Sequence, residues 1–132
     1  GTLTQNKMTV QKLFYNNRII DIDEVDTNKE NEELGRLVYI SMLCNDTKIG
    51  ENKQLTGDPT ETALIDMGFK LDFTPAVFDQ MPRVEEVPFD SERKLMTTVN
   101  KKNGKYIVYT KGGWQPIYGL HKRWSRWITS KM

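Results

Sequence analysis

Hydrophobic and polar positions follow two different periods along the chain, and the period changes near residue 83. Within 31–44 and 59–68, apolar residues recur three and four positions apart, which puts them on one face of a helix. Three later segments, 83–89, 94–100 and 105–111, are short, contain β-branched residues and are typical of strands. The pattern therefore predicts helices in the first part of the chain and a sheet in the second.

Turn signals indicate how the strands are connected. Asn16-Asn17 separates two apolar segments, 7–15 and 18–23, and Asn103-Gly104 separates the last two predicted strands. Both central positions of a type I′ turn need positive φ, which Asn and Gly tolerate best. We expect two antiparallel hairpins and an α+β fold, in which an antiparallel β-sheet is flanked by helices.

The second predicted helix has a clear start signal. Asp58 is a good N-cap, Pro59 suits the first helical position, and Glu61 follows three residues after the cap. This spacing predicts a capping box, in which Asp58 accepts from the amide of Glu61 and the Glu61 carboxylate reaches back. We expect Gly68 to end this helix, a polar loop to precede it, and a short helical segment near 74–80. Its buried stripe comprises Ala63, Leu64 and Met67.

Composition narrows the class of protein. With 37% hydrophobic and 28% charged residues, the 132-residue chain has the make-up of one globular domain. A net charge of +1 argues against a dedicated nucleic-acid binder, and no apolar stretch reaches the roughly 18 residues of a membrane span. Cys44 is the single cysteine and lies in an apolar run, so we expect a buried free thiol, as in a reducing cytosol. Seven acids within 21–33 show no compact ligand spacing, and we interpret them as a solvated loop.

The last nineteen residues differ from the rest. Segment 114–132 contains all three Trp, the only His and four basic residues, without any acid. An altered reading frame or a cloning scar is our hypothesis for this abrupt shift. A basic, Trp-rich tail also leaves open the binding of nucleic acid or another anionic surface.

Three short stretches carry candidate chemistry. Glu61 could cap its helix or hold a ligand. Phe89, at a strand end with Lys94 five residues later, could stack a flat base or simply pack at an edge. Lys111 ends a strand whose same face is apolar, and Gly112 beside it would let a ligand approach the backbone, although a solvated strand-end lysine is the plainer interpretation. Neither a P-loop nor a GxGxxG motif is present.

Taken together and in this order, the motifs resemble the nucleotide-binding domain of P-type cation-transporting ATPases. The motifs are LCND at 43–46, GDPTETAL at 57–64, FDSERKLMTTV at 89–99 and TKGG at 110–113. GTLTQNKMTV at 1–10 is similar to the tail of the family's DKTGTLT phosphorylation motif, whose acceptor aspartate would lie three positions before Gly1. GDPTETAL with LCND is most similar to bacterial members of the calcium-transporting branch.

The resemblance implies a site for ATP. In it, Glu61 hydrogen-bonds the adenine amino group, Phe89 stacks on adenine, and Lys94 lies near the nucleotide. Lys111 and Gly112 wall the pocket as part of the family's KGA motif, in which Gly113 here replaces alanine. Ser91 stands where some relatives carry an arginine on the phosphates. No catalytic residue and no metal ligand is implied within this chain, and Mg²⁺ acts in the full-length enzyme.

The resemblance also implies an organisation and partners. We expect residues 1–113 to form the nucleotide-binding domain, incomplete at its C-terminal side, with 114–132 as an atypical tail. Its partners would be ATP and the phosphorylation, actuator and transmembrane domains of the same parent chain, at the cytoplasmic face of the cell membrane. We expect no nucleic acid and no direct membrane contact. The alternative is a truncated structural fragment that does not bind nucleotide.

Overall fold

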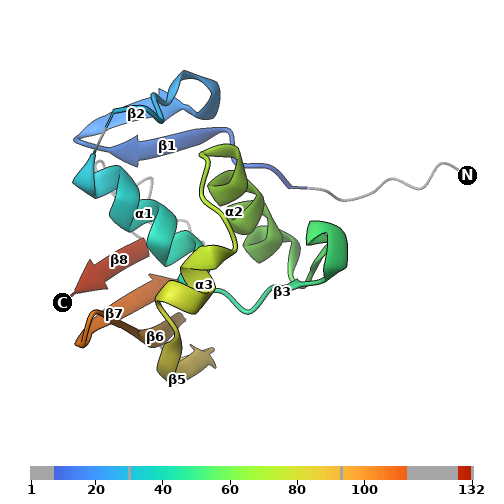
Figure 1. The fold of residues 1–132 in the computed structure, drawn as a ribbon, viewed down its shortest axis with the longest axis vertical. Coiled ribbons are helices and arrows are strands. Elements are labelled where there is room, and N and C mark those ends of the chain that lie inside the picture. The colour runs from blue at the N-terminus through green and yellow to red at the C-terminus, as the bar shows by residue number, and fades with distance from the viewer. Residues whose placement is uncertain (1–7, 30, 93, 113–127, 132) are drawn as a thin grey trace, which may run out of the picture.

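The computed structural model describes residues 8–29, 31–92, 94–112 and 128–131, with side chains to residue 112. Helix α1 (Glu32–Leu43) packs against strands β7 (Lys105–Gly112) and β8 (Ile128–Lys131) of an antiparallel sheet, and helix α2 (Pro59–Lys70) packs on α1 (Figure 1). This arrangement confirms the predicted α+β fold. The helices are α1 (Glu32–Leu43), α2 (Pro59–Lys70) and α3 (Ala76–Gln80), and the four strands of the sheet, in spatial order, are β5 (Arg83–Asp90), β6 (Leu95–Lys102), β7 (Lys105–Gly112) and β8 (Ile128–Lys131).

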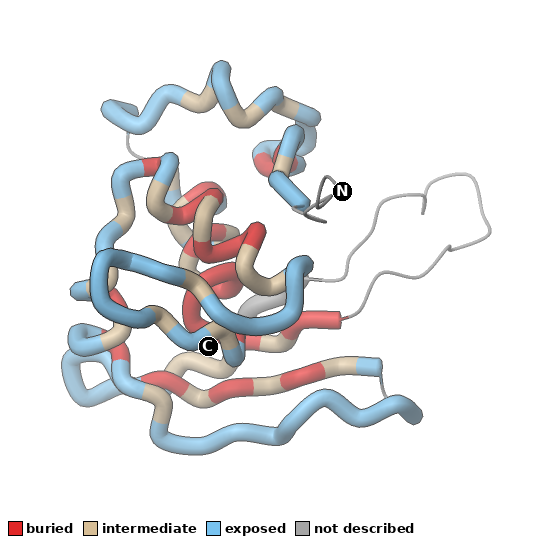
Figure 2. The backbone as a smooth tube through the Cα atoms, turned by 90° about the vertical axis from the view of Figure 1, so that its right-hand side faces the viewer, coloured by how far each residue is buried: buried red, intermediate tan, exposed pale blue. Residues whose placement is uncertain are grey.

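The three predicted strands of the sheet are confirmed to within a few residues. Asn103 and Gly104 take φ values of 51° and 78°, so the turn between β6 and β7 has the positive φ angles expected there. Along β6, buried and partly exposed residues alternate, whereas β5 at the sheet edge is exposed almost throughout (Figure 2). Strand β8 adds to the other side of β7, in a segment where the sequence predicts no element.

The N-terminal hairpin is also confirmed, with shorter strands than predicted. Strand β1 (Lys12–Tyr15) pairs antiparallel with β2 (Arg18–Asp21), and Asn16 and Asn17 between them have φ values of 52° and 60°. A short 3-10 turn, Ile22–Glu24, follows. The hairpin lies over the N-terminal end of α1 (Figure 1).

The loop predicted between α1 and α2 contains a small hairpin. Strands β3 (Lys48–Ile49) and β4 (Leu55–Thr56) pair antiparallel around a 3-10 turn, Glu51–Lys53. The amide of Gly50 donates to the Gln54 carbonyl at 2.7 Å and closes the turn. The prediction of a loop without strands was therefore wrong, because two-residue strands are too short to show a period.

Helices α1 and α2 begin where the sequence predicts. The Asn31 side chain accepts from the Leu34 amide at 3.0 Å, and the Asp58 side chain accepts from the Thr60 amide at 2.8 Å. The predicted end of α2 at Gly68 was wrong, because the helix continues to Lys70. Gly68 is instead the point of close approach to α1, since a Cβ there would lie 2.8 Å from Met42 Cγ.

The core lies between the two helices and the sheet. Cys44, at the end of α1, is fully buried and its thiol donates to the carbonyls of Met96 at 3.4 Å and Tyr109 at 3.7 Å. Burial raises the pKa of the Cys44 thiol. The expected buried, free cysteine is confirmed. The largest fully buried apolar side chains are Val38, Met42, Ile65 and Met67.

Candidate functional site

The candidate residues come from three separate elements. Glu61 lies in the first turn of α2, Lys111 and Gly112 end β7, and Phe89 lies near the end of β5. Lys94 lies in the turn between β5 and β6. The Glu61 side chain lies between helix α2 and the sheet.

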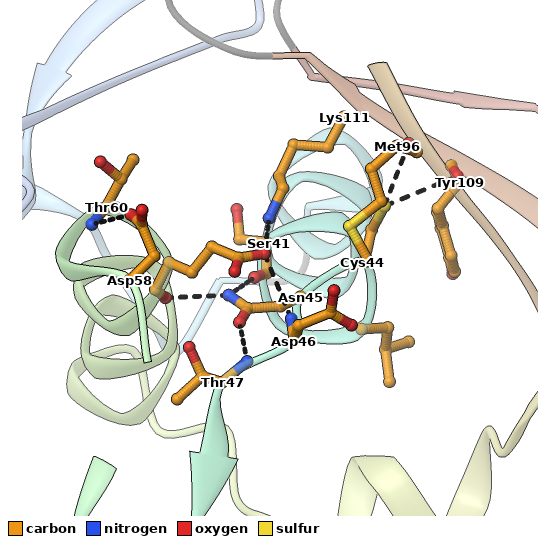
Figure 3. A network of polar contacts seen from close by, with 12 residues as sticks. Ser41, Cys44, Asn45, Asp46, Thr47, Asp58, Thr60, Met96, Tyr109 and Lys111 are labelled. Atoms are coloured by element: carbon orange, nitrogen blue, oxygen red, sulfur yellow. Dashed lines mark hydrogen bonds and ion pairs between the residues drawn. The ribbon is translucent and has the colours of Figure 1, made fainter. Parts of the chain in front are cut away.

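Glu61 and Lys111 form a largely buried ion pair. The Lys111 Nζ donates to Glu61 Oε2 at 2.6 Å, and only 9% of the lysine side chain and 20% of the glutamate side chain are exposed. The backbone amide of Asp46 donates to the same Oε2 at 3.2 Å. Figure 3 shows Lys111 reaching from the sheet toward the helices and Asp46 approaching from the end of α1.

This geometry contradicts the predicted capping box. Asp58 accepts from the amide of Thr60 rather than from that of Glu61, and the Glu61 carboxylate turns to Lys111 and Asp46 instead of reaching back. A nearby ammonium in a poorly solvated setting attracts a carboxylate more strongly than a neutral amide does. Lys111 therefore does not present a free charge, and the idea of a solvated strand-end lysine is wrong.

The hydrogen bonds described for the Glu61 carboxylate all go to one of its two oxygens, Oε2. Among the residues that the structure describes, both donors bind Oε2 and none binds Oε1. A carboxylate has about four lone-pair sites, so a ligand amino group can still donate to it while the ion pair persists. The arrangement holds Glu61 in one orientation and leaves it an acceptor.

Strand register brings Phe89 and Lys94 to the same end of the sheet. Leu95 pairs with Asp90 on one side and with Gly112 on the other, so the end of β5 lies two strands from the end of β7. Two strand spacings amount to about 10 Å. Phe89, next to Asp90, is 56% exposed. An exposed aromatic residue therefore lies at the same end of the sheet as Lys111, about two strands away.

Lys94 is held in a tight turn. Its φ is 58°, and its amide donates to the Asp90 carbonyl at 2.5 Å, which closes the turn between β5 and β6. The residue is exposed. Lys94 is thus an exposed cation at the same sheet end, whereas the ammonium of Lys111 is buried and paired with Glu61.

Sequence reasoning missed two residues that hold Glu61 or the loop beside it. The Asn45 side chain donates to the carbonyls of Ser41 at 2.9 Å and Glu61 at 2.8 Å. Arg83, at the start of β5, donates to the carbonyls of Leu43 and Asn45 and forms an ion pair with Asp46 at 3.0 Å. The LCND motif marked this segment, but its pattern alone does not indicate these contacts.

The described residues contain neither a candidate metal site nor a candidate membrane-spanning helix. There, no three His, Cys, Asp or Glu residues lie close enough together to hold a metal ion. No helix in that part of the chain is both long and apolar enough to cross a membrane.

Comparison with known proteins identifies the family. Residues 33–122 match the family described as P-type ATPase, cytoplasmic domain N. The chain belongs to this family. The matched range runs past Gly113 into segment 114–132, so the domain boundary at that end stays a prediction.

Relatives of this domain N include proteins named as calcium transporters. The chain is 40% identical over 118 residues to "Calcium-transporting ATPase 1" of Lactococcus lactis, covering 86% of this chain and 13% of the relative. It is 38% identical over 113 residues to a protein of the same name in Bacillus cereus, covering 85% and 12%. "Calcium-transporting ATPase 1" of Saccharomyces cerevisiae is 30% identical over 135 residues, covering 89% and 14%. The chain thus spans a small part of each relative's length.

Proposed function

We propose that this domain N binds ATP for a cation-transporting P-type ATPase and holds the adenine base between Glu61 and Phe89. The observation that carries the proposal is a carboxylate fixed by two donors at Oε2, with no donor to Oε1 among the residues that the structure describes. The adenine amino group is a donor, and a charged acceptor makes a hydrogen bond roughly twice as strong as a neutral one. Guanine carries a carbonyl at the equivalent position, which the carboxylate would repel.

Phe89 would supply the stacking surface. Its ring is exposed at a sheet edge, where packing does not explain it, and stacking of a base on an aromatic ring is worth roughly 1–3 kcal/mol. Gly112 would leave room for the base beside Lys111, since it has no side chain. Lys94, exposed in the adjacent turn, would attract the phosphates as a compact point charge.

In the whole enzyme, this domain would deliver ATP to a phosphorylation domain. The carboxylate of an aspartate preceding Gly1 would attack the γ-phosphorus, the bond to the β–γ bridging oxygen would break, and ADP would leave. Mg²⁺ would accompany the phosphates, and the proposal assigns no metal ligand to this chain. Residues 1–113 would form the domain, with actuator and transmembrane domains as partners at the cytoplasmic face of the membrane. The names of the relatives favour calcium as the transported ion.

Titration of the chain with ATP and with GTP tests the proposal. We expect ATP to bind more tightly than GTP, and Glu61→Gln to reduce ATP affinity and to shrink the preference. Folding of each variant is verified by circular dichroism before the titration. Absence of ATP binding at millimolar concentration would favour the alternative of a structural fragment that does not bind nucleotide.

A further inference from the structure

The side chain of Asn45 joins the two helices next to Glu61. Its amide nitrogen donates to the carbonyl of Ser41, in the last turn of α1, and to the carbonyl of Glu61 itself, in the first turn of α2. Its amide oxygen accepts from the Thr47 amide at 2.8 Å. Both donors and the acceptor of this buried amide, which is 6% exposed, are therefore used (Figure 3).

Asp46, the residue after Asn45, forms a second contact with Glu61. The Asp46 amide reaches the Glu61 carboxylate, while the Asp46 side chain is held by Arg83 at 3.0 Å. The Arg83 guanidinium also binds the Asn45 carbonyl at 2.9 Å. Glu61 is thus fixed twice by the same loop, at its backbone through Asn45 and at its carboxylate through Asp46.

We infer that Asn45 is a positioning residue that sets the selectivity of the site for adenine over guanine, an inference that rests on the proposed function. Asn45 touches no ligand in this scheme and acts through Glu61. A binding group has to be held to within about 0.5 Å to discriminate between ligands, and such precision comes from side chains that are themselves locked. Asn45 supplies that lock, because it fixes the start of α2 to the end of α1.

The other contacts of Glu61 do not replace this function. Lys111 has a long, flexible stem and its ammonium can follow a displaced carboxylate. The Asp46 amide holds only Oε2 and therefore does not fix the helix turn that carries the side chain. If Asn45 no longer binds the Glu61 carbonyl, the first turn of α2 can shift while the ion pair persists.

A matched pair of variants tests this inference. Asn45→Ser keeps a hydroxyl that can accept from the Thr47 amide but is too short to bridge to Glu61. Asn100→Ser is the control, because Asn100 is another buried amide, which donates to the Met81 carbonyl at 2.8 Å on a different part of the sheet. The whole 132-residue chain is titrated with ATP and GTP, and stability is followed by denaturant unfolding.

We expect Asn45→Ser to reduce the ATP-to-GTP affinity ratio by about tenfold, the effect of losing one well-placed charge-assisted hydrogen bond. Asn100→Ser should lower stability comparably and leave the ratio unchanged. An equal loss of ratio in both variants, or none in Asn45→Ser, would overturn the inference. If Asn45→Ser does not fold, Arg83→Lys replaces it, since lysine lacks the planar fork with which Arg83 holds Asp46 on one nitrogen and the Leu43 and Asn45 carbonyls on the other. A lower ratio in Arg83→Lys supports the inference, and an unchanged ratio overturns it.

The controls separate this inference from the proposed function. If the unmodified chain does not prefer ATP, or if Glu61→Gln leaves the ratio unchanged, the proposed function itself fails. If Glu61→Gln lowers the ratio but Asn45→Ser does not, only the positioning role fails.

Discussion

The ammonium of Lys111 lies 2.6 Å from the Glu61 carboxylate, although the two residues are 50 positions apart in the sequence. Both side chains are largely removed from water. Such a pair adds little net stability compared with an apolar pair, but breaking it leaves a poorly solvated charge. Replacing either Glu61 or Lys111 alone should therefore destabilise the fold, because the charge of the other residue loses its partner.

Replacing Lys111 with methionine should destabilise the fold. The Glu61 carboxylate would stay poorly solvated, with the Asp46 amide as its remaining partner among the described residues, and we expect a loss of about 3 kcal/mol in the free energy of unfolding. The double variant Glu61→Gln with Lys111→Met should regain part of that loss, because it removes both charges. Urea unfolding of the three proteins measures both effects.

An exposed ion pair serves as the control. Lys12 and Asp21 pair across the N-terminal hairpin at 3.4 Å, with 64% and 49% of their side chains exposed. Lys12→Met should therefore change stability by less than about 1 kcal/mol. If Lys111→Met is as mild as Lys12→Met, the Glu61–Lys111 pair is not formed in solution.

Phe89→Ala should weaken ATP binding without weakening the fold. The ring is mostly exposed, so its loss removes little buried area, while a stacked base would lose roughly 1–3 kcal/mol. Tyr106→Ala, at the opposite end of the sheet, removes another exposed ring and should leave ATP affinity unchanged. Isothermal titration calorimetry measures the ATP affinity of both variants. Equal ATP affinities of the two variants would show that Phe89 is not part of the site.

Two glycine substitutions should change stability in opposite directions. Alanine is favoured over glycine within a helix by about 1 kcal/mol. In α1, a Cβ on Gly35 would meet nothing within 4 Å, so Gly35→Ala should stabilise. In α2, a Cβ on Gly68 would clash with the buried Met42 side chain, so Gly68→Ala should destabilise by about 1–3 kcal/mol. Thermal unfolding measures both changes in stability. Stabilisation by Gly68→Ala would show that α1 and α2 pack less closely at Gly68 than the contact with Met42 indicates.

Stability should fall at alkaline pH partly because of Tyr109. Burial raises the pKa of Tyr109 to about 12 from an ordinary value of 10.0. The phenol therefore ionises first in the unfolded chain, and stability that is complete below pH 10 declines as pH rises toward about 12. Tyr109→Phe should flatten this decline relative to the exposed control Tyr106→Phe. Urea unfolding at pH 9, 10 and 11 provides the measurement.

Patterns among residues that are close together in the sequence were sufficient to predict most of the helices and strands. The asparagine-rich turns at Asn16-Asn17 and Asn103-Gly104 require positive φ, and both have it. The apolar stripe of α2 is buried as its spacing predicts, with Ala63, Leu64 and Met67 among the buried residues. These features depend on residues within one turn or one hairpin, and the sequence displays such neighbours directly.

Features that depend on distant residues were not predictable in this way. Glu61 has the spacing of a capping residue, yet its carboxylate is drawn to a cation on β7. Gly68 resembles a helix end, but its missing side chain serves the contact with Met42. The contacts of Asn45 with Glu61 and of Arg83 with Leu43 show no local pattern, because in each case the partner is distant in the sequence.

The long sequence separation around Glu61 also bears on how the chain folds. Lys111, the ion-pair partner of Glu61, lies near the end of β7. The thiol of Cys44 likewise donates to the carbonyl of Tyr109, which is 65 residues away in the sequence. Contacts between distant residues form slowly, because a long loop has to close first. During synthesis, α1 and α2 would leave the ribosome well before β7. Until β7 follows, the Glu61 carboxylate would lack the Lys111 ammonium as its ion-pair partner. The Glu61–Lys111 ion pair would therefore form only after β7 has been synthesised.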